Sequence, residues 1–306
     1  MKNAIDKLTN RFHRLGFYFY SVKFSYQQKS KKENKIKCLL KSVISNTKIF
    51  NTKYGYYEYL EIPITTKCSL RCKNCSNIIP YYTNRFDYDI DILLKSIKEF
   101  LKLINNIVYI RVLGGEPFLS NNLYKVLNLL IKSNKIQKVE IVTNGTIIPT
   151  DKKLIELLKN KKITVSISKY PIVKHKQDRL IEFLQNNNIN YRIDKMNYWM
   201  DYGKPKKRNK TEKELKKQFS RCNSVCKSLI NGQFHLCPRS SHGTDLGILT
   251  NNEEDYLDLL DNTLSTKEKK EKLNKLLKKD YIKACDYCIF GTKESKKIPV
   301  AEQIKD

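Results

Sequence analysis

The chain has 306 residues, of which 40% are hydrophobic and 10% aromatic, so it can bury a substantial core and is not a disordered chain. Its formal net charge of +28 raises nucleic acid as a partner. Only ten of the 59 basic residues are arginine, however, and abundant asparagine accompanies the lysine, as codon drift in an AT-rich genome would produce. We therefore expect the charge to reflect drift and nucleic acid not to be the partner.

The longest aromatic and apolar run, residues 15–20, is far shorter than the roughly 20 apolar residues that span a bilayer. The sequence therefore predicts a cytoplasmic protein without a membrane span. The chain has nine cysteines. In a reducing compartment, clustered cysteines indicate metal binding or catalysis more often than disulfides.

Residues 1–57 lack the pattern that follows and are interpreted as an N-terminal extension of unknown role. From residue 58, short apolar or β-branched runs alternate with stretches whose apolar residues recur at helical spacing. The strands are expected at 59–65, 108–113, 138–143, 163–168 and 190–195, with helices between them and Asp89 or Asp91 capping the first helix.

This alternation predicts an α/β fold with a parallel sheet, either an open doubly wound sheet or a full or partial barrel. Both architectures bind ligands at the carboxyl ends of their strands. The residues of chemical interest stand at those ends. They are Cys68 after the first strand, Gly114 after the second, Asn144 after the third, and Ser166 and Ser168 at the end of the fourth.

Cys68, Cys72 and Cys75 place three thiols within eight residues. Thiolates are soft ligands suited to iron–sulfur clusters, and three ligands leave one iron of a four-iron cube open to a substrate or cofactor. Zinc is the alternative, but no histidine lies nearby to complete a tetrahedral site. The spacing therefore favours a 4Fe–4S cluster with an open iron.

With this triad at the end of the first strand, the chain resembles the radical S-adenosylmethionine (SAM) superfamily over residues 58 to about 200. The resemblance implies a partial (β/α)6 barrel like part of a TIM barrel. It also implies that SAM chelates the open iron and is cleaved by an electron to a 5′-deoxyadenosyl radical, which abstracts hydrogen from a substrate. A flavodoxin or ferredoxin would be the electron donor.

Gly114-Gly115-Glu116-Pro117 matches the Gly-Gly-Glu-Pro motif of that family, and by this resemblance Gly114, Gly115 and Glu116 bind the SAM amino group. Asn144 is expected near the SAM ribose or carboxylate, although its Asn-Gly sequence is equally typical of a tight turn. Ser166 and Ser168 share one face of their strand, so either contacts SAM or packs inside the barrel.

Five further cysteines follow a charged stretch at 203–219, and their spacing resembles the SPASM and Twitch auxiliary-cluster domains. The shorter Twitch form predicts a second 4Fe–4S cluster in residues 206–306, after a core at 58–205. The expected ligands are Cys222, Cys237, Cys285 and Cys288. Cys226 is left as a substitute ligand or as a free thiol facing the substrate. A structural zinc site is the alternative. An Asn-Gly hairpin turn is predicted at 231–232.

Next to these cysteines, Arg239 could clamp a carboxylate or phosphate and His242 could move a proton, although either could be a surface residue. The compact auxiliary region favours oxidation or modification of a small, carbohydrate-like molecule. The alternatives are radical SAM modification of a peptide, protein or RNA, and a non-enzymatic zinc-binding module, for which the Gly-Gly-Glu-Pro segment would have no purpose.

Overall fold

The computed structural model describes residues 56–222 and 226–304. Almost all of the predicted N-terminal extension lies outside the described residues. The five predicted strands are all present, and most begin one to three residues earlier than expected. They are β1 (Tyr56–Pro63), β2 (Asn106–Leu113), β3 (Ile136–Thr143), β4 (Ile163–Lys169) and β5 (Tyr191–Lys195).

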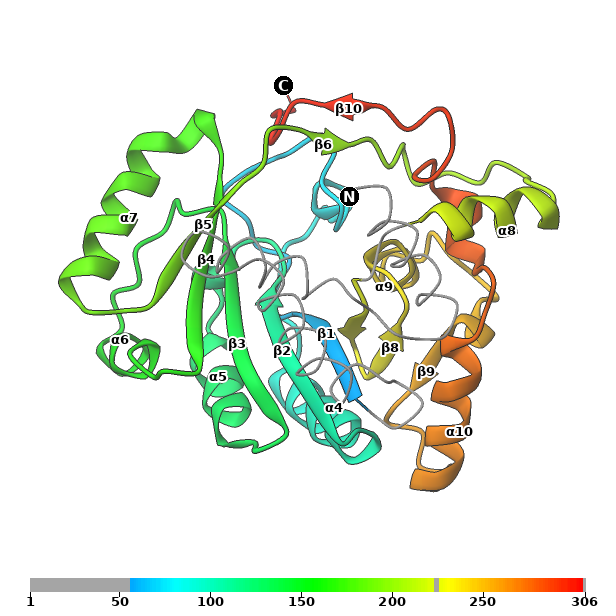
Figure 1. Cartoon of the computed structure of the whole chain (residues 1–306), viewed down its shortest axis with the longest axis horizontal. Helices are drawn as coiled ribbons and strands as arrows, with labels where there is room; N and C mark the ends of the chain where they lie inside the picture. Colours follow the sequence, from blue (N-terminus) through cyan, green and yellow to red (C-terminus); the bar gives the residue numbers. More distant parts are fainter. Residues whose placement is uncertain (1–55, 223–225, 305–306) are drawn as a thin grey trace, which may run out of the picture.

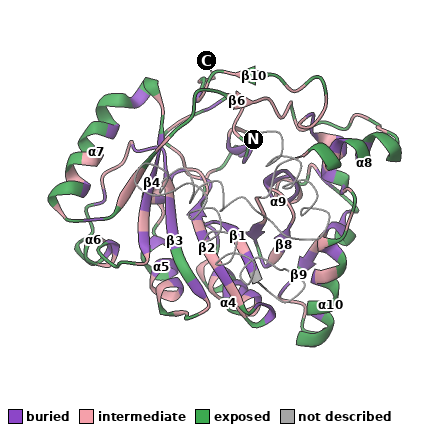
Figure 2. Ribbon diagram, in the orientation of Figure 1, coloured by how far each residue is buried: buried purple, intermediate pink, exposed green. Residues whose placement is uncertain are grey.

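The expected helices follow their strands, each with its apolar face turned to the sheet (Figures 1 and 2). They are α4 (Ile90–Leu103), α5 (Leu123–Lys132), α6 (Lys152–Leu158) and α7 (Lys174–Asn186). Asp89, rather than Asp91, caps α4, because its carboxylate accepts the backbone N–H groups of Asp91 and Ile92 at 2.9 Å each.

The main sheet has eight strands in the order β5-β4-β3-β2-β1-β7-β8-β9. The five strands from β5 to β1 pair in parallel, as the strand–helix alternation predicts. β5 and β9 stand at opposite ends of this order, so the sheet is open. The α/β prediction is confirmed, and the curved, open sheet is consistent with a partial TIM-like barrel (Figure 1).

The C-terminal strands extend the same sheet across residue 206. β7 (Ser228–Ile230) lies parallel to β1 through the pair Glu61 and Ser228, while β8 (Gln233–His235) and β9 (Tyr256–Asp258) continue antiparallel. The predicted hairpin is confirmed between β7 and β8, where Asn231 and Gly232 both have positive φ. Strand hydrogen bonds therefore connect the core to the cysteine-rich region.

The remaining helices and strands lie mostly in the C-terminal half of the chain. α8 precedes Cys222, α9 follows Cys237, and α10 contacts α4 on the outside of the sheet. A two-stranded antiparallel pair, β6 with β10, lies apart from the main sheet. Their bounds are α8 (Glu212–Arg221), α9 (Pro238–Asp245), α10 (Thr266–Leu277), β6 (Trp199–Met200) and β10 (Lys297–Ile298), with short 3-10 turns η2 (Ile79–Tyr81), η3 (Pro117–Leu119), η4 (Pro171–Val173), η5 (Glu253–Asp255) and η6 (Lys283–Tyr287).

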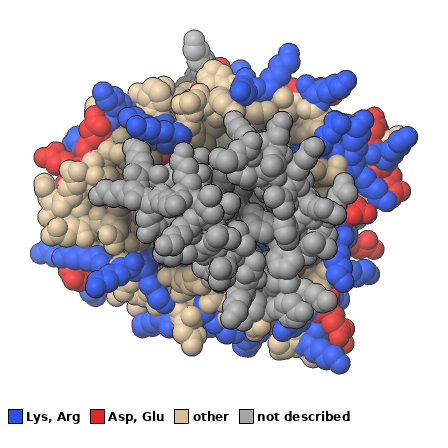
Figure 3. All heavy atoms as spheres, in the orientation of Figure 1, with Lys and Arg blue, Asp and Glu red and all other residues tan. Residues whose placement is uncertain are grey.

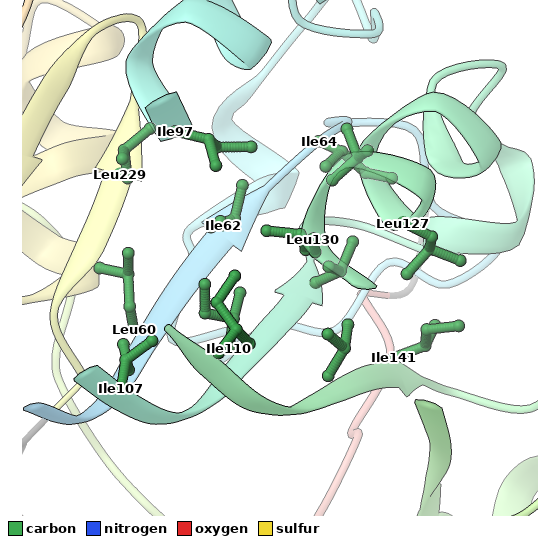
Figure 4. Close-up of a cluster of buried hydrophobic side chains, with 14 of the residues drawn as sticks. Leu60, Ile62, Ile64, Ile97, Ile107, Ile110, Leu127, Leu130, Ile141 and Leu229 are labelled. Atoms are coloured by element: carbon green, nitrogen blue, oxygen red, sulfur yellow. The ribbon is translucent and has the colours of Figure 1, made fainter. Parts of the chain in front are cut away.

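One hydrophobic core joins both halves of the chain. Leu60, Ile62 and Ile110 from the parallel strands share it with Leu229 of β7 (Figure 4). Phe234 of β8 also belongs to it and stacks on a phenylalanine of α4. Since burying a large apolar side chain stabilises a fold by roughly 1.5–3 kcal/mol, this shared core holds β7 and β8 against the parallel strands.

The opposite face of the parallel strands is polar. Side chains alternate with period two, so Tyr59, Glu61, Arg111 and Glu140 face away from the apolar core. Arg111 bridges neighbouring strands by donating to Glu140 at 2.8 Å and to the Tyr59 hydroxyl at 3.2 Å. This face therefore carries a charged network across β1, β2 and β3.

Lysine and arginine side chains are spread around the whole rim of the face that Figure 3 shows, interspersed with acidic residues. This dispersal fits a solvated surface rather than one basic patch. Within the described part of the chain, no helix combines the length and apolar character that a membrane crossing requires.

Candidate active site

The loop after β1 carries the cysteine triad. Cys68 and Cys75 are partly exposed and Cys72 is buried, and the Cys75 backbone N–H donates to the Cys72 carbonyl at 3.2 Å. Burial raises the pKa of Cys68 to about 12 and that of Cys72 to about 11, and the neighbouring thiols add to each rise. The three thiols therefore lie close enough to repel one another when ionised, and metal binding would displace their protons.

The C-terminal segment binds this loop, which the sequence did not predict. The Lys73 N–H donates to the Glu302 carbonyl, and the Ile304 N–H donates to the Arg71 carbonyl, each at 2.8 Å. The side-chain oxygen of Gln303 accepts the Arg71 N–H at 2.8 Å, so its amide nitrogen is the donor that lies 3.2 Å from the Cys72 sulfur.

Gly114 and Gly115 allow the loop after β2 to approach the triad loop. A Cβ atom on Gly114 would lie 2.2 Å from the Thr65 carbonyl oxygen, and one on Gly115 would lie 2.1 Å from that of Lys67. Gly114 also has a φ of +144°, which favours glycine. The space beside the glycines is therefore filled by backbone of this chain, which gives them a packing role. Their contact with SAM stays a prediction.

Glu116 is fully buried and joins the loop after β2 to the end of β3. Its carboxylate accepts hydrogen bonds from the Asn144 N–H at 2.9 Å, the Thr143 hydroxyl at 2.8 Å and the Phe118 N–H at 3.2 Å. Burial raises its pKa to about 7, although these three bonds oppose the rise. Both oxygens are engaged, so Glu116 positions the ends of two neighbouring strands.

Asn144 brings the end of β3 to the triad. Its amide nitrogen lies 3.7 Å from the Cys68 sulfur and 3.1 Å from the Ser69 hydroxyl, and Gln177 of α7 donates to its carbonyl at 2.7 Å. Ser168 also receives a bond from Gln177, at its carbonyl. Asn144 therefore lies beside Cys68, and its contact with SAM stays a prediction.

Ser166 lies deeper on the polar face of the sheet. Its hydroxyl donates to Asp194 at 2.6 Å and accepts from Arg192 at 3.1 Å. The Ser166 hydroxyl is therefore bonded to side chains of β5. Its contact with SAM stays a prediction.

The four predicted auxiliary ligands come from three parts of the chain. Cys222 ends α8, Cys237 caps α9, and Cys285 and Cys288 flank the last part of η6. Burial raises the pKa of Cys237 well above its usual value, and Cys285, Cys222 and Cys288 raise it further. Burial likewise raises the pKa of Cys285 to about 12, with added contributions from Cys222 and Cys288.

Cys226 has different surroundings. Its sulfur lies 3.5 Å from the Tyr59 hydroxyl, which donates its one proton to Glu61. Burial raises the pKa of Cys226 to about 12, and the Glu61 carboxylate raises it further. Cys226 therefore joins the polar network of β1, while Cys222 joins the other three cysteines.

Arg239 and His242 are both buried on α9, so neither is a surface residue. Burial lowers the pKa of His242 to about 3, which keeps its ring neutral at pH 7. A proton-moving role for His242 at neutral pH is therefore opposed by its surroundings.

The thiols of the triad are ligands that an iron–sulfur cluster takes. Within residues 56–222 and 226–304, no three His, Cys, Asp or Glu side chains converge tightly enough to hold a single metal ion. Three neighbouring thiols beside Asn144 and the Gly-Gly-Glu loop suit a cluster with one open iron.

Residues 62–217 match the profile of the Radical SAM superfamily, and the chain belongs to this superfamily. Its members bind SAM and a 4Fe–4S cluster, so membership implies both cofactors here.

Curated relatives include GTP 3′,8-cyclases. One from Helicobacter pylori is 30% identical over 135 residues, covering 42% of this chain and 39% of the relative. One from Clostridium perfringens is 28% identical over 151 residues, covering 47% and 44%. The matched stretch thus spans about two fifths of these relatives.

Similar solved structures include anSMEcpe with bound AdoMet and a peptide, at 15% identity and a TM-score of 0.49, covering 80% of this chain and 93% of that one. BtrN in complex with AdoMet and 2-DOIA has 15% identity and a TM-score of 0.42, covering 81% and 97%.

Proposed function

We propose that this protein is a radical SAM enzyme with a second, auxiliary 4Fe–4S cluster, and that it oxidises or otherwise modifies a small, polar, carbohydrate-like molecule. The observation that carries the proposal is the meeting of three neighbouring strand ends. Cys68 follows β1, Glu116 follows β2 and Asn144 follows β3, and hydrogen bonds join the three segments. Together with superfamily membership, this meeting supports SAM chemistry at the carboxyl ends of these strands.

In this proposal Cys68, Cys72 and Cys75 hold the first cluster. When bound, the cluster and SAM would supply a radical that removes hydrogen from the substrate. Glu116 keeps the Gly-Gly-Glu loop against β3, and Asn144 lies beside Cys68, where a polar contact with SAM is expected. A flavodoxin or ferredoxin would deliver the electron.

The auxiliary cluster would be held by Cys222, Cys237, Cys285 and Cys288. Burial raises the pKa values of Cys237 and Cys285, and support comes from the further rise that Cys222 and Cys288 cause in both; Cys226 is not among the causes for either. A second cluster suits removal of the second electron after hydrogen abstraction, so net oxidation is the expected outcome. Zinc at this site is the alternative that iron and sulfide analysis would reveal.

Cys226 is proposed to face the substrate. Its thiol lies beside Tyr59 and Glu61, and burial raises the pKa of Glu61. A carboxyl group that readily keeps its proton is suited to exchanging one with a substrate hydroxyl. The polar inner face on β1 to β3 likewise favours a substrate rich in hydroxyl groups over an apolar one.

The test is anaerobic reconstitution of the full chain, followed by iron and sulfide counts and by measurement of 5′-deoxyadenosine after addition of SAM and dithionite. Near eight irons per chain are expected, against near four if only the triad binds a cluster. A variant with all three triad cysteines replaced by alanine is the control. Equal 5′-deoxyadenosine production by that variant would refute the proposal.

Substrate screening should include sugars, sugar phosphates and GTP, the last because it appears in the name of the curated relatives. A compound that increases 5′-deoxyadenosine formation and is itself consumed would identify the substrate class. Consumption of only a peptide or RNA would reject the small-molecule part of the proposal and leave the SAM chemistry standing.

A further inference from the structure

The helix α9 holds an unusual concentration of unsatisfied polar atoms. Among the described residues, five buried side-chain nitrogen or oxygen atoms lack a hydrogen-bond partner, and three of them belong to Arg239 and His242. These are Nε and Nη1 of Arg239 and Nε2 of His242. The two side chains are 7% and 0% exposed and stand three residues apart, so they share one side of the helix.

Arg239 is a buried cation without an acidic partner among the described residues. Its Nη2 donates to the Gly203 carbonyl, and its guanidinium lies 5.9 Å from the centre of the Tyr202 ring. Three N–H groups, one on Nε and two on Nη1, remain unused. Burying such a group is costly unless an anion pairs with it, so its surroundings suit an oxyanion.

Arg239 lies near both the triad and the auxiliary cysteines. Its positive charge lowers the pKa of Cys75, the last thiol of the triad, although burial raises that pKa overall. Arg239 also stands two residues after Cys237, a proposed ligand of the auxiliary cluster. A ligand bound to this guanidinium would therefore lie near both proposed clusters.

His242 offers a hydrogen-bond acceptor. The Tyr82 hydroxyl has one proton, which it donates to the Asp245 carboxylate at 2.7 Å, so it accepts from Nδ1 of His242 at 2.9 Å. Nδ1 therefore carries the ring proton. Nε2 of the neutral ring has a lone pair and no partner, which suits a hydroxyl or N–H donor on a ligand.

We propose that Arg239 and His242 form the substrate-recognition site, in which Arg239 binds a carboxylate or phosphate and His242 accepts a hydrogen bond from a hydroxyl of the same molecule. The inference rests on the proposed function and narrows its substrate class to acidic or phosphorylated polyhydroxy compounds. Neither residue is needed to hold iron in this assignment.

The test measures binding of inorganic phosphate and of succinate to the reconstituted full chain by anaerobic calorimetry, with SAM present to occupy the open iron. Wild type should bind one of these anions once per chain. Arg239→Gln should weaken that binding at least tenfold and Arg239→Lys by less, because lysine keeps the charge without the planar geometry. Arg208→Gln, which removes a nearby arginine that bonds only backbone carbonyls, should change it less than twofold.

Phosphate binding without succinate binding, or the reverse, identifies the anionic group. His242→Leu should leave the affinity for the simple anion within twofold, since the imidazole is assigned to a hydroxyl. Absence of binding by wild type, unchanged binding by both Arg239 variants, or equal weakening by Arg208→Gln would each overturn the site. Dithionite-driven SAM cleavage by the same wild-type preparation separates this result from failure of the proposed function.

Discussion

Replacing Gln303 with leucine removes a hydrogen bond from the side-chain amide to the sulfur of Cys72, which lies 3.2 Å away. Hydrogen bonds to cluster sulfurs favour the reduced, more negative state and so raise the reduction potential. A bond of this kind is worth about 0.5–1.5 kcal/mol net. For a one-electron couple, this corresponds to a potential lower by about 20–65 mV in the variant.

The assay is an anaerobic redox titration of the reconstituted chain, with the reduced triad cluster followed by electron paramagnetic resonance. Glu302→Gln is the matched control. It alters the neighbouring residue of the same segment and removes only an exposed ion pair to Lys73, with the two atoms 3.6 Å apart. An unchanged potential in Gln303→Leu, or the same shift in both variants, would refute the reasoning.

Three further outcomes are expected. Cys222→Ser should lower the iron count from near eight to near four per chain, whereas Cys226→Ser should leave it near eight. Loss of iron from Cys226→Ser and not from Cys222→Ser would show that Cys226 is the ligand and Cys222 the free thiol. Gly115→Ala should lower the free energy of unfolding by about 1–3 kcal/mol, because its new Cβ meets a backbone oxygen at 2.1 Å; an unchanged urea midpoint would contradict this. Burial lowers the pKa of His242 to about 3, so between pH 6.5 and 3 the unfolded chain binds more protons than the folded chain. The free energy of unfolding therefore falls as the pH falls through this window, and His242 accounts for up to about 2 kcal/mol of that loss by pH 5. Urea unfolding of His242→Gln at several pH values should no longer show this contribution.

The sequence predicted the parallel half of the fold because its strands and helices are long enough to display their periods. The same logic located Cys68, Gly114 and Asn144, since carboxyl ends of parallel strands share one edge. It could not assign Glu116 its hydrogen-bonding role, because that role depends on the approach of β3 to the loop after β2.

Other features were missed for identifiable reasons. α8 and α10 both begin with capping boxes, Thr211 with Glu214 and Ser265 with Glu268, and this local signal was present in the printed sequence. The contact of Gln303 with the triad has no local signal, because more than 200 residues separate the partners. β7, β8 and β9 have three residues each, too few for a strand period to show.

The continuous sheet bears on whether residues 206–306 form a separate domain. Phe234 of β8 is fully buried and stacks on Phe100 of α4 with ring centres 5.5 Å apart, inside the core shared with β1 and β2. Phe234→Ala should therefore cost about 3–5 kcal/mol and destabilise both halves together. Trp199, the single tryptophan, packs against Tyr170 and pairs with Ile298 of β10, so its fluorescence reports on a contact between the two halves. Its fluorescence midpoint in urea should fall by the same amount as the far-ultraviolet circular dichroism midpoint. If the dichroism transition splits, or if the two midpoints move by different amounts, the halves unfold separately and the shared core does not couple them.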